Sequence, residues 1–346
     1  MLPSRLTYRL ILVAGLVTAL ASCGKAPQEE EHSSRELSVL FSANTGLVGD
    51  AYNELILQGV MESTAAGADV GIHLLKPANL SEARTQFNNW MASATADKAL
   101  ILCGLEYEQL LQGVALPEGR ILLLDSDKEF SKGISTALLK RYGGAWLSGA
   151  LLQDFHLQLI KALGGDRVID TIAQGVRDGY SDNGGEDYHE FTLATGYQGM
   201  NMADELFRRI FMREDIHLSN ASDGILFPVC GASRLGAFSY SQNYYYAAVG
   251  CGEDCSAYSD CLPFSLVLDL GTLVKEYIAQ WMQDTPWPAT AEFGLRTGHV
   301  RIRFNERFYE GVLGTWNEWP IPLSGWKALE AGYHEQALEK EAGHAY

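Results

Sequence analysis

From residue 37 onward, short apolar runs alternate with amphipathic segments along the chain. Runs such as Ser38 to Ser42 and Ile121 to Asp125 are rich in leucine or β-branched residues, which indicates strands buried on both faces. The stretch from Asp50 to Ser63 places apolar residues on one helical face, with Asp50 as its N-cap. Strands separated by helices in this way predict a parallel, doubly wound sheet. Further strands are expected over residues 70–75 and 99–103, and further helices over residues 81–94 and 107–112.

The same alternation starts again near residue 143 and continues to residue 304. Two such series, followed by late strands, predict two similar α/β lobes joined by a hinge that the chain crosses more than once. The expected helices cover residues 143–154, 166–182, 200–213, 233–242 and 272–282, and the expected strands 157–163, 189–194, 224–229, 246–250, 264–270, 291–295 and 299–304. The expected division is residues 37–138 plus 255–288 for the first lobe, 139–254 plus 289–325 for the second, and 326–346 for a C-terminal extension.

The first residues have the layout of an export signal. Arg5 and Arg9 precede an apolar core from Leu10 to Ala21, which suits a signal peptide and is too short to span a bilayer. The segment ends in Leu20-Ala21-Ser22-Cys23, which matches the lipobox of bacterial lipoproteins; an ordinary cleaved signal with a chance cysteine is the alternative. We therefore expect a signal peptide over residues 1–22, lipidation of Cys23 by diacylglycerol and then palmitate-like acyl chains, and an exported protein anchored to the cell membrane. Whether it faces the periplasm or the outer surface stays open.

Residues 23–36 contain almost no apolar side chain and include a run of three glutamates. Such a segment cannot bury enough surface to fold, so it is expected to be a flexible lipidated tether. The whole chain has 26 Lys plus Arg against 43 Asp plus Glu, a net charge of −17, which repels the nucleic-acid backbone. This charge excludes nucleic acid as a partner.

Five cysteines remain besides Cys23. In an oxidising compartment this odd number predicts one or two disulfides and a leftover thiol. Cys251, Cys255 and Cys261 lie in one Gly/Asp-rich loop, where a local bridge is expected. A metal site is the alternative, but no histidine lies nearby and the spacing is not that of zinc sites. No metal and no cofactor are therefore expected.

The candidate ligand site follows from the predicted sheets, because ligands bind beyond the carboxyl ends of parallel strands. Catalytic patterns are missing: the sequence has no GxSxG elbow, Walker loop or dinucleotide fingerprint, and His189-Glu190 is not part of a zinc-protease motif. A binding protein is therefore expected rather than an enzyme. The predicted strand ends that would face a shared cleft are residues 44–53, 103–104, 125–127, 195–197, 230–233 and 252–254.

Three segments at these ends resemble the basic membrane protein family of ABC-transporter binding lipoproteins, which includes purine nucleoside receptors. The segment Gly46-Leu47-Val48-Gly49-Asp50-Ala51-Tyr52-Asn53 resembles the family's Gly-Leu/Ile-Gly/Asp-Asp-x-Ser-Phe-Asn motif. Residues 142–151 resemble Gln-Glu-Gly-Ser-Phe-Leu-Ala-Gly-Tyr-Leu, and residues 223–233 resemble Ala-Asp-Val-Ile-Phe-Pro-Val-Ala-Gly-Gly-Ser. The Gly175 to Gly179 stretch is similar to the family's Gly-Phe-x-x-Gly helix, and the whole match runs in order over residues 38 to 305.

The resemblance implies a type I periplasmic-binding-protein fold and delivery of a nucleoside-like ligand to an ABC permease. It implies that Tyr52 and Tyr197 bracket a flat ring, although Tyr52 could instead be a core aromatic residue. Asp125 could instead cap the following turn. The ligand-binding residues carried over by position are Asn44, Asp50, Tyr52, Asn53, Asp125, Tyr197, Gly231, Ser233 and Asp254.

The sequence departs from the family pattern at two strand ends. The aspartate expected to hold ribose hydroxyls falls on Gly252, so Glu253 or Asp254 would have to substitute. A family lysine falls on Leu268. The expected function is a lipid-anchored solute-binding protein of an ABC importer. The alternative is a surface lipoprotein of the same fold that has lost its ligand.

Overall fold

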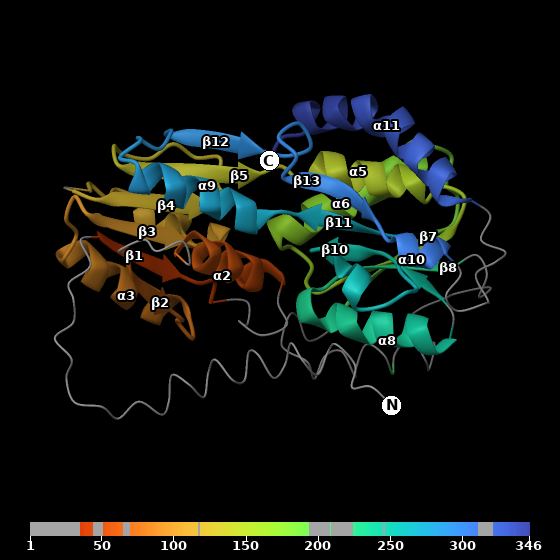
Figure 1. Ribbon diagram of the computed structural model, residues 1–346, viewed down its shortest axis with the longest axis horizontal. Coiled ribbons are helices and arrows are strands. Elements are labelled where there is room, and N and C mark those ends of the chain that lie inside the picture. The colour runs from red at the N-terminus through yellow and green to blue at the C-terminus, as the bar shows by residue number, and fades with distance from the viewer. Residues whose placement is uncertain are drawn as a thin grey trace.

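The computed structural model describes residues 35–43, 51–64, 70–116, 118–193, 208, 224–244, 246–310 and 321–346. The expected signal peptide, Cys23 and residues 24–34 of the expected tether lie outside these residues, as do Asn44, Asp50, Tyr197 and most of the helix expected over residues 200–213. Arg35 and Glu36, which were expected to belong to the tether, instead begin the first strand. The described chain forms two α/β lobes that lie side by side (Figure 1).

The first lobe contains a six-stranded sheet in the order β12-β5-β4-β3-β1-β2, in which every neighbouring pair is parallel. Helices α2 (Ala51–Thr64) and α9 (Leu270–Met282) pack against each other on one face. Helices α3 (Leu80–Ala92) and α4 (Glu108–Leu111), with the short 3-10 helix η1 (Leu105–Tyr107), cover the other face. The strands are β1 (Arg35–Leu40), β2 (Val70–Leu75), β3 (Lys98–Leu102), β4 (Arg120–Leu124), β5 (Ile134–Leu139) and β12 (Thr290–Phe293).

Both faces of the central strands are buried, which explains their continuous apolar sequence. Leu37 and Val39 belong to the core under α2 and α9, whereas Leu40 belongs to a separate core under α3 and α4. The same alternation occurs in β3, where Ile101 and Leu100 lie in the two different cores. The prediction of a doubly wound parallel sheet is confirmed for this lobe.

The second lobe contains two smaller sheets. One has the order β7-β6-β8-β9 and is parallel throughout; the other has the order β10-β11-β13, with β13 antiparallel to β11. Its strands are β6 (His156–Lys161), β7 (Tyr188–Thr192), β8 (Gly224–Val229), β9 (Ala247–Ala248), β10 (Gly250–Gly252), β11 (Phe264–Leu268) and β13 (Val300–Phe304). Its helices are α5 (Tyr142–Leu151), α6 (Arg167–Asp182), α8 (Arg234–Tyr244), α10 (Glu306–Tyr309), α11 (Leu323–Gly343) and the 3-10 turns η2 (Gly231–Ser233) and η3 (Cys255–Ala257).

Helices α5 and α6 pack at very short distance because each presents a glycine to the backbone of the other. A Cβ atom on Gly179 would lie 1.9 Å from the carbonyl oxygen of Trp146, and one on Gly149 would lie 2.0 Å from that of Val176. The backbones can touch only because both positions lack a side chain. The glycine-containing segments singled out in the sequence therefore form the helix pair at the centre of the second lobe.

Helix α11, expected only as an extension, covers α5 along the outside of the second lobe (Figure 1). Trp326 is fully buried and stacks on Phe155 with ring centroids 5.9 Å apart. The C-terminal end lies at the junction of the lobes, where the backbone N–H of Tyr142 donates to the hydroxyl of Tyr346 at 3.0 Å (Figure 1).

The chain crosses between the lobes after β5, after β11, and between β12 and β13. This differs from the expected division in two strands. Residues 264–268 pair with β10 and β13 in the second lobe instead of the first, and residues 290–293 pair with β5 in the first lobe instead of the second. Strand β5 itself was not expected, although its sequence ISTALL is fully buried.

The disulfide expectation is wrong for this structure. Cys103, Cys230, Cys251, Cys255 and Cys261 are all free thiols and all buried. Burial raises the pKa of Cys251 to about 12 and that of Cys255 to about 11, so both remain protonated at neutral pH. The cysteine-rich loop is therefore held by packing and hydrogen bonds rather than by a covalent bridge.

Candidate functional site

A cavity of about 390 Å³ lies where the carboxyl ends of the strands of both lobes meet. The first lobe supplies residues after β1, β3 and β4 and the start of α2, and the second lobe supplies residues after β6, β8, β10 and β11. This size lies within the range of small-molecule sites. The lining residues are Ser42, Tyr52, Leu55, Gly104, Leu105, Glu106, Asp125, Arg141, Gly165, Asp166, Arg167, Val168, Ile169, Ile172, Val229, Cys230, Gly231, Cys251, Gly252, Leu268 and Leu270.

A buried ion pair lies in this cavity beside the first crossing between the lobes. Nη2 of Arg141 lies 2.7 Å from Oδ1 of Asp125, and both side chains are almost fully buried. Asp125 follows β4 with a positive φ of 67°, and Arg141 follows β5 and donates through Nη1 to the carbonyl of Leu139 at 2.9 Å. Burial alone would lower the pKa of Arg141, but the charge of Asp125 raises it, so the guanidinium stays charged. The Nε of Arg141 has no hydrogen-bond partner among the described residues and is available to a ligand.

Tyr52 lies in the first turn of α2 and contributes an aromatic ring to the cavity. Burial, and then the negative charge of Asp125, raise the pKa of Tyr52 well above its ordinary value. The phenol is therefore neutral and can act as a flat apolar surface with a polar hydroxyl group. Leu55 from the same helix and Ile172 from α6 extend the apolar part of the wall.

Glu106 supplies a carboxyl group from η1, just after β3. The hydroxyl of Ser42 donates a short hydrogen bond to its Oε1. Burial raises the pKa of Glu106, and the Ser42 bond opposes this only in part. Gly104 makes room for the group, because a Cβ atom there would lie 2.2 Å from Oε2 of Glu106.

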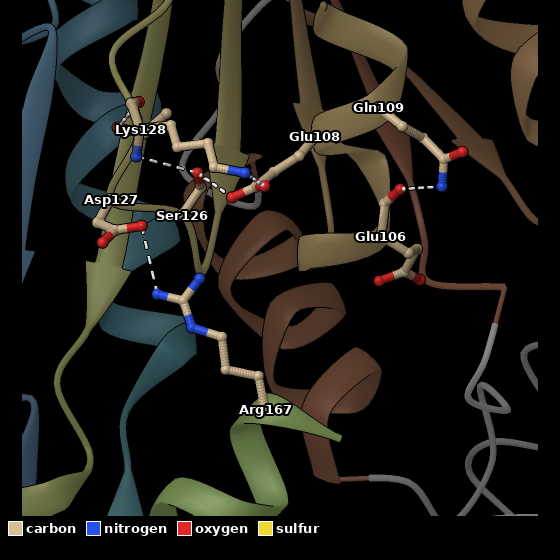
Figure 2. Close-up of polar contacts among 8 residues, drawn as sticks. Glu106, Glu108, Gln109, Ser126, Asp127, Lys128 and Arg167 are labelled. Atoms are coloured by element: carbon tan, nitrogen blue, oxygen red, sulfur yellow. Dashed lines mark hydrogen bonds and ion pairs between the residues drawn. The ribbon is translucent and has the colours of Figure 1, made fainter. Parts of the chain in front are cut away.

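The wall from the second lobe is organised by the beginning of α6. The side chain of Asp166 accepts from the backbone N–H groups of Val168 at 2.9 Å and Ile169 at 3.1 Å, so it caps this helix. The next residue, Arg167, reaches across the cleft, and its Nη2 lies 3.3 Å from Oδ1 of Asp127 in the first lobe (Figure 2). This ion pair links the two lobes at the edge of the cavity.

The loops after β8 and β10 are fixed by a second buried cation. Arg234 donates through Nη1 to the carbonyl of Gly231 at 2.8 Å and forms a short ion pair with Glu253. The hydroxyl of Tyr258 also donates to Glu253, at 3.0 Å. Glu253 is therefore committed to holding the loops, and Gly252 beside it lines the cavity with no side chain.

The structure brings Tyr52, Asp125 and Gly231 together in the cavity, as the sequence predicts. Two other expected residues are fully buried and do not line it: Asn53 and Ser233. The position of Asp254 corrects its expected role, because it caps η3 by accepting from the N–H of Ser256 and lies 3.6 Å from Arg303.

Four charged lining residues were missed: Glu106, Arg141, Asp166 and Arg167. Arg141 follows the strand that was not expected, so its position at a strand end was hidden. The signal was a buried apolar run over residues 134–139 that ends in Lys140-Arg141. Arg167 follows Gly164-Gly165-Asp166, a turn and N-cap directly after β6. That loop follows a predicted strand, so it belongs with the strand ends that were expected to face the cleft.

Two further properties of the described residues concern metal binding and membrane insertion. Within the described residues, no cluster of three or more His, Cys, Asp or Glu side chains is arranged to hold a metal ion. None of the helices in the described parts of the chain has both the length and the apolar character needed to cross a bilayer.

The sequence itself matches no protein-family model and no curated protein. Solved structures match the fold. A solute-binding protein of an ABC transporter system from Aeropyrum pernix K1 is 14% identical with a TM-score of 0.67, over 89% of this chain and 90% of that chain. A periplasmic solute-binding protein of an ABC transporter from Actinobacillus succinogenes 130z with bound D-allose is 10% identical with a TM-score of 0.56, over 80% and 99%.

A transcriptional activator of the comK gene from Bacillus halodurans is also similar, at 13% identity and a TM-score of 0.61, over 87% and 98% of the two chains. At such identities the likeness establishes the fold alone. The chain has the type I periplasmic-binding-protein fold, as predicted, and its structural neighbours include ABC-transporter solute-binding proteins. The narrower resemblance to the basic membrane protein family stays a prediction.

Proposed function

We propose that this protein is the solute-binding component of an ABC-type importer and captures a small polar ligand between its two lobes. The observation that carries the proposal is the cavity, which both lobes line with the ends of their parallel strands. It combines an aromatic ring, an apolar wall and a buried charged pair, which are the elements of a specific small-molecule site. The proposal is a binding function and assigns no catalytic role to the residues that line the cavity.

The proposed ligand is nucleoside-like. Tyr52 with Leu55 and Ile172 offers a surface for a flat ring, and Asp125 with Arg141 offers acceptors and donors for hydroxyl groups. A sugar, such as the D-allose bound to the neighbour from Actinobacillus succinogenes, shares the hydroxyl groups but lacks the flat ring. Gly252 cannot supply the carboxylate that the family resemblance implies, so Asp125 is proposed to take the hydroxyl contacts.

The proposal includes export and a lipid anchor on Cys23, followed by a polar tether that ends before β1 begins at Arg35. Lipidation would hold the binding lobes near a permease in the same membrane. It is tested by following the full-length protein and a Cys23→Ala variant through membrane fractionation with labelled palmitate. Label on both proteins, or on neither, would reject the anchor.

Ligand capture is tested by thermal unfolding of the purified protein with adenosine, inosine, uridine, glucose and allose. A ligand that binds the native state raises Tm, and the stabilisation grows with the logarithm of one plus its concentration over Kd. Tyr52→Ala should weaken the binding of a nucleoside by about fivefold to 150-fold, since stacking on one aromatic ring is worth about 1–3 kcal/mol. A glucose-only response would replace the nucleoside by a sugar.

The competing function is a protein of this fold that has lost its ligand. The open cavity speaks against it, since a site without selection for binding would be expected to fill with side chains. The ligand-free function would be supported if no compound in the panel changed Tm, if Tyr52→Ala changed no binding, and if mass spectrometry found no small molecule co-purifying with the protein.

A further inference from the structure

Two carboxyl groups leave the same turn of the first lobe in different directions (Figure 2). Glu108 points to Lys128 and Ser126, forms a short ion pair with Lys128, and accepts from the Ser126 hydroxyl at 2.7 Å. Glu106 points away from them and lines the cavity. The two groups have the same chemistry, but only Glu108 has a cation beside it.

The cations of the cavity are already paired elsewhere. Arg141 pairs with Asp125, and Arg167 pairs with Asp127. Among the described residues, the carboxyl group of Glu106 has the hydroxyl of Ser42 as its only side-chain partner and forms no ion pair. A carboxylate that is partly removed from water and lacks a cation is costly, and a donor brought by a ligand would relieve that cost.

The surrounding charge strengthens the argument. Asp125 and Asp166 both line the cavity and both raise the pKa of Glu106 by repulsion, after the larger effect of burial. The negative potential at this point favours a positive or N–H-rich group and disfavours a ligand acceptor. Arg141 and Arg167 also line the cavity, but each is paired with an aspartate, so neither supplies a free cation to Glu106.

We infer that Glu106 selects ligands that present an amino group to it. This inference rests on the proposed function, because it assigns a preference to the same cavity. The amino group could be the exocyclic amine of a nucleobase or the amine of an amino sugar. Both kinds of ligand offer N–H donors to the buried carboxylate. They differ in the scaffold that carries the amine, a flat nucleobase or a sugar ring.

The experiment compares matched pairs of compounds by calorimetric titration of the intact protein at neutral pH. Adenosine against inosine differs at the base position that carries an amino group in one and an oxygen in the other. Glucosamine against glucose differs by an amine in place of a hydroxyl. We expect the amine member of one pair to bind about tenfold to a hundredfold more tightly, the range for a hydrogen bond to a charged group.

Two variants assign the preference to its residue. Glu106→Gln keeps the shape and removes the charge, and we expect the preference of the amine member to fall to less than threefold. Glu108→Gln is the matched control, because it changes a carboxyl group two residues away that does not line the cavity. This control should leave the preference as in the wild type, and circular dichroism with Tm checks that both variants fold.

The outcomes separate this inference from the proposed function. If compounds bind without an amine preference, or if Glu106→Gln keeps the preference, the inference is overturned and ligand capture stands. If Glu108→Gln removes the preference as well, the assignment to Glu106 is overturned. If no compound of either pair binds and none co-purifies, both the inference and the proposed function fail.

Discussion

Glu341 is a buried carboxyl group of the second lobe that faces the backbone of other elements. It lies on α11 against Gly143 of α5 and Gly294, and its Oε2 accepts from the N–H of Leu295 at 3.3 Å. No ion pair to it is present among the described residues, although Lys140 and Arg296 act on it from a distance against Glu292. Burial raises the pKa of Glu341 to about 7. The group therefore changes its charge within the range of ordinary buffers.

We expect this residue to make stability depend on pH. Between the ordinary glutamate pKa of about 4.3 and a pKa of about 7, the native protein holds a proton that the unfolded chain has released. The free energy of unfolding therefore falls as pH rises through this interval, by about 3 kcal/mol in all. Glu341→Gln should remove this fall, so its stability relative to the wild type should increase from pH 5 to pH 8 in urea unfolding.

The control for this prediction is Glu339→Gln, which changes an exposed glutamate on the same helix. Its stability curve should run parallel to that of the wild type across the same pH range. Parallel curves for Glu341→Gln as well would show that the buried carboxyl group does not titrate as described.

At the scale of elements, the pairing of α5 with α6 depends on two glycines. Adding a methyl group to Gly179 places it 1.9 Å from the carbonyl oxygen of Trp146, and the obstacle is backbone that cannot rotate away. We expect Gly179→Ala to lower the free energy of unfolding by about 3 kcal/mol or more, because overpacking here must separate two helices. Urea unfolding measures this loss.

Gly332 provides the opposite case on α11. A methyl group there would meet no atom within 4 Å, and the residue is exposed. Gly332→Ala should therefore raise stability by up to about 1 kcal/mol through helix propensity alone. Equal effects of the two substitutions would contradict the role given to close helix packing.

The helices and strands also show which parts of the fold can be predicted from the sequence. Strands such as β2 and β8 have the predicted bounds, because an apolar run of about six residues is long enough for a strand and too short for an ordinary helix. The apolar pattern does not predict to which lobe a strand belongs. The apolar pattern of residues 264–268 and 290–293 is the same in either sheet, and only long-range pairing with β10 or β5 decides it. Arg141 was missed for a different reason: β5, the strand before it, was not predicted, because Ser135 and Thr136 interrupt its apolar run.

The sequence predicts the cavity residues that lie at strand ends better than it predicts the charged residues of the cavity wall. Tyr52, Asp125 and Gly231 follow from strand ends and from a resemblance in sequence. Glu106 and Arg167 differ from many other charged residues of an acidic chain only in facing the cavity. That orientation depends on the turn of η1 and on the N-terminal cap of α6, which the residue types alone do not determine.

At the scale of the whole molecule, the ion pair between Arg167 and Asp127 joins the two lobes across the mouth of the cavity (Figure 2). Binding proteins with a hinge close around their ligand, so a contact between the lobes favours the closed arrangement. Both side chains are about one-third exposed, at 33% and 39%, so the pair is screened by water and salt. Its contribution should lie within about 0–1 kcal/mol.

We expect Asp127→Asn to shift the lobes towards an open arrangement without altering the cavity wall, since Asp127 does not line it. A loss of up to 1 kcal/mol corresponds to at most about a fivefold lower fraction of closed molecules and a Kd raised by no more than that factor. Small-angle scattering should give a larger radius of gyration for the unliganded variant than for the wild type. Salt at 0.5 M, where the Debye length is about 4 Å, should reduce the difference. Asp260→Asn is the matched control, because it breaks a 3.0 Å surface pair with Arg307 inside one lobe and should leave the radius unchanged. Identical radii for the two variants would mean that the interlobe pair does not bias closure, and the energy of closing would then have to come from the ligand alone.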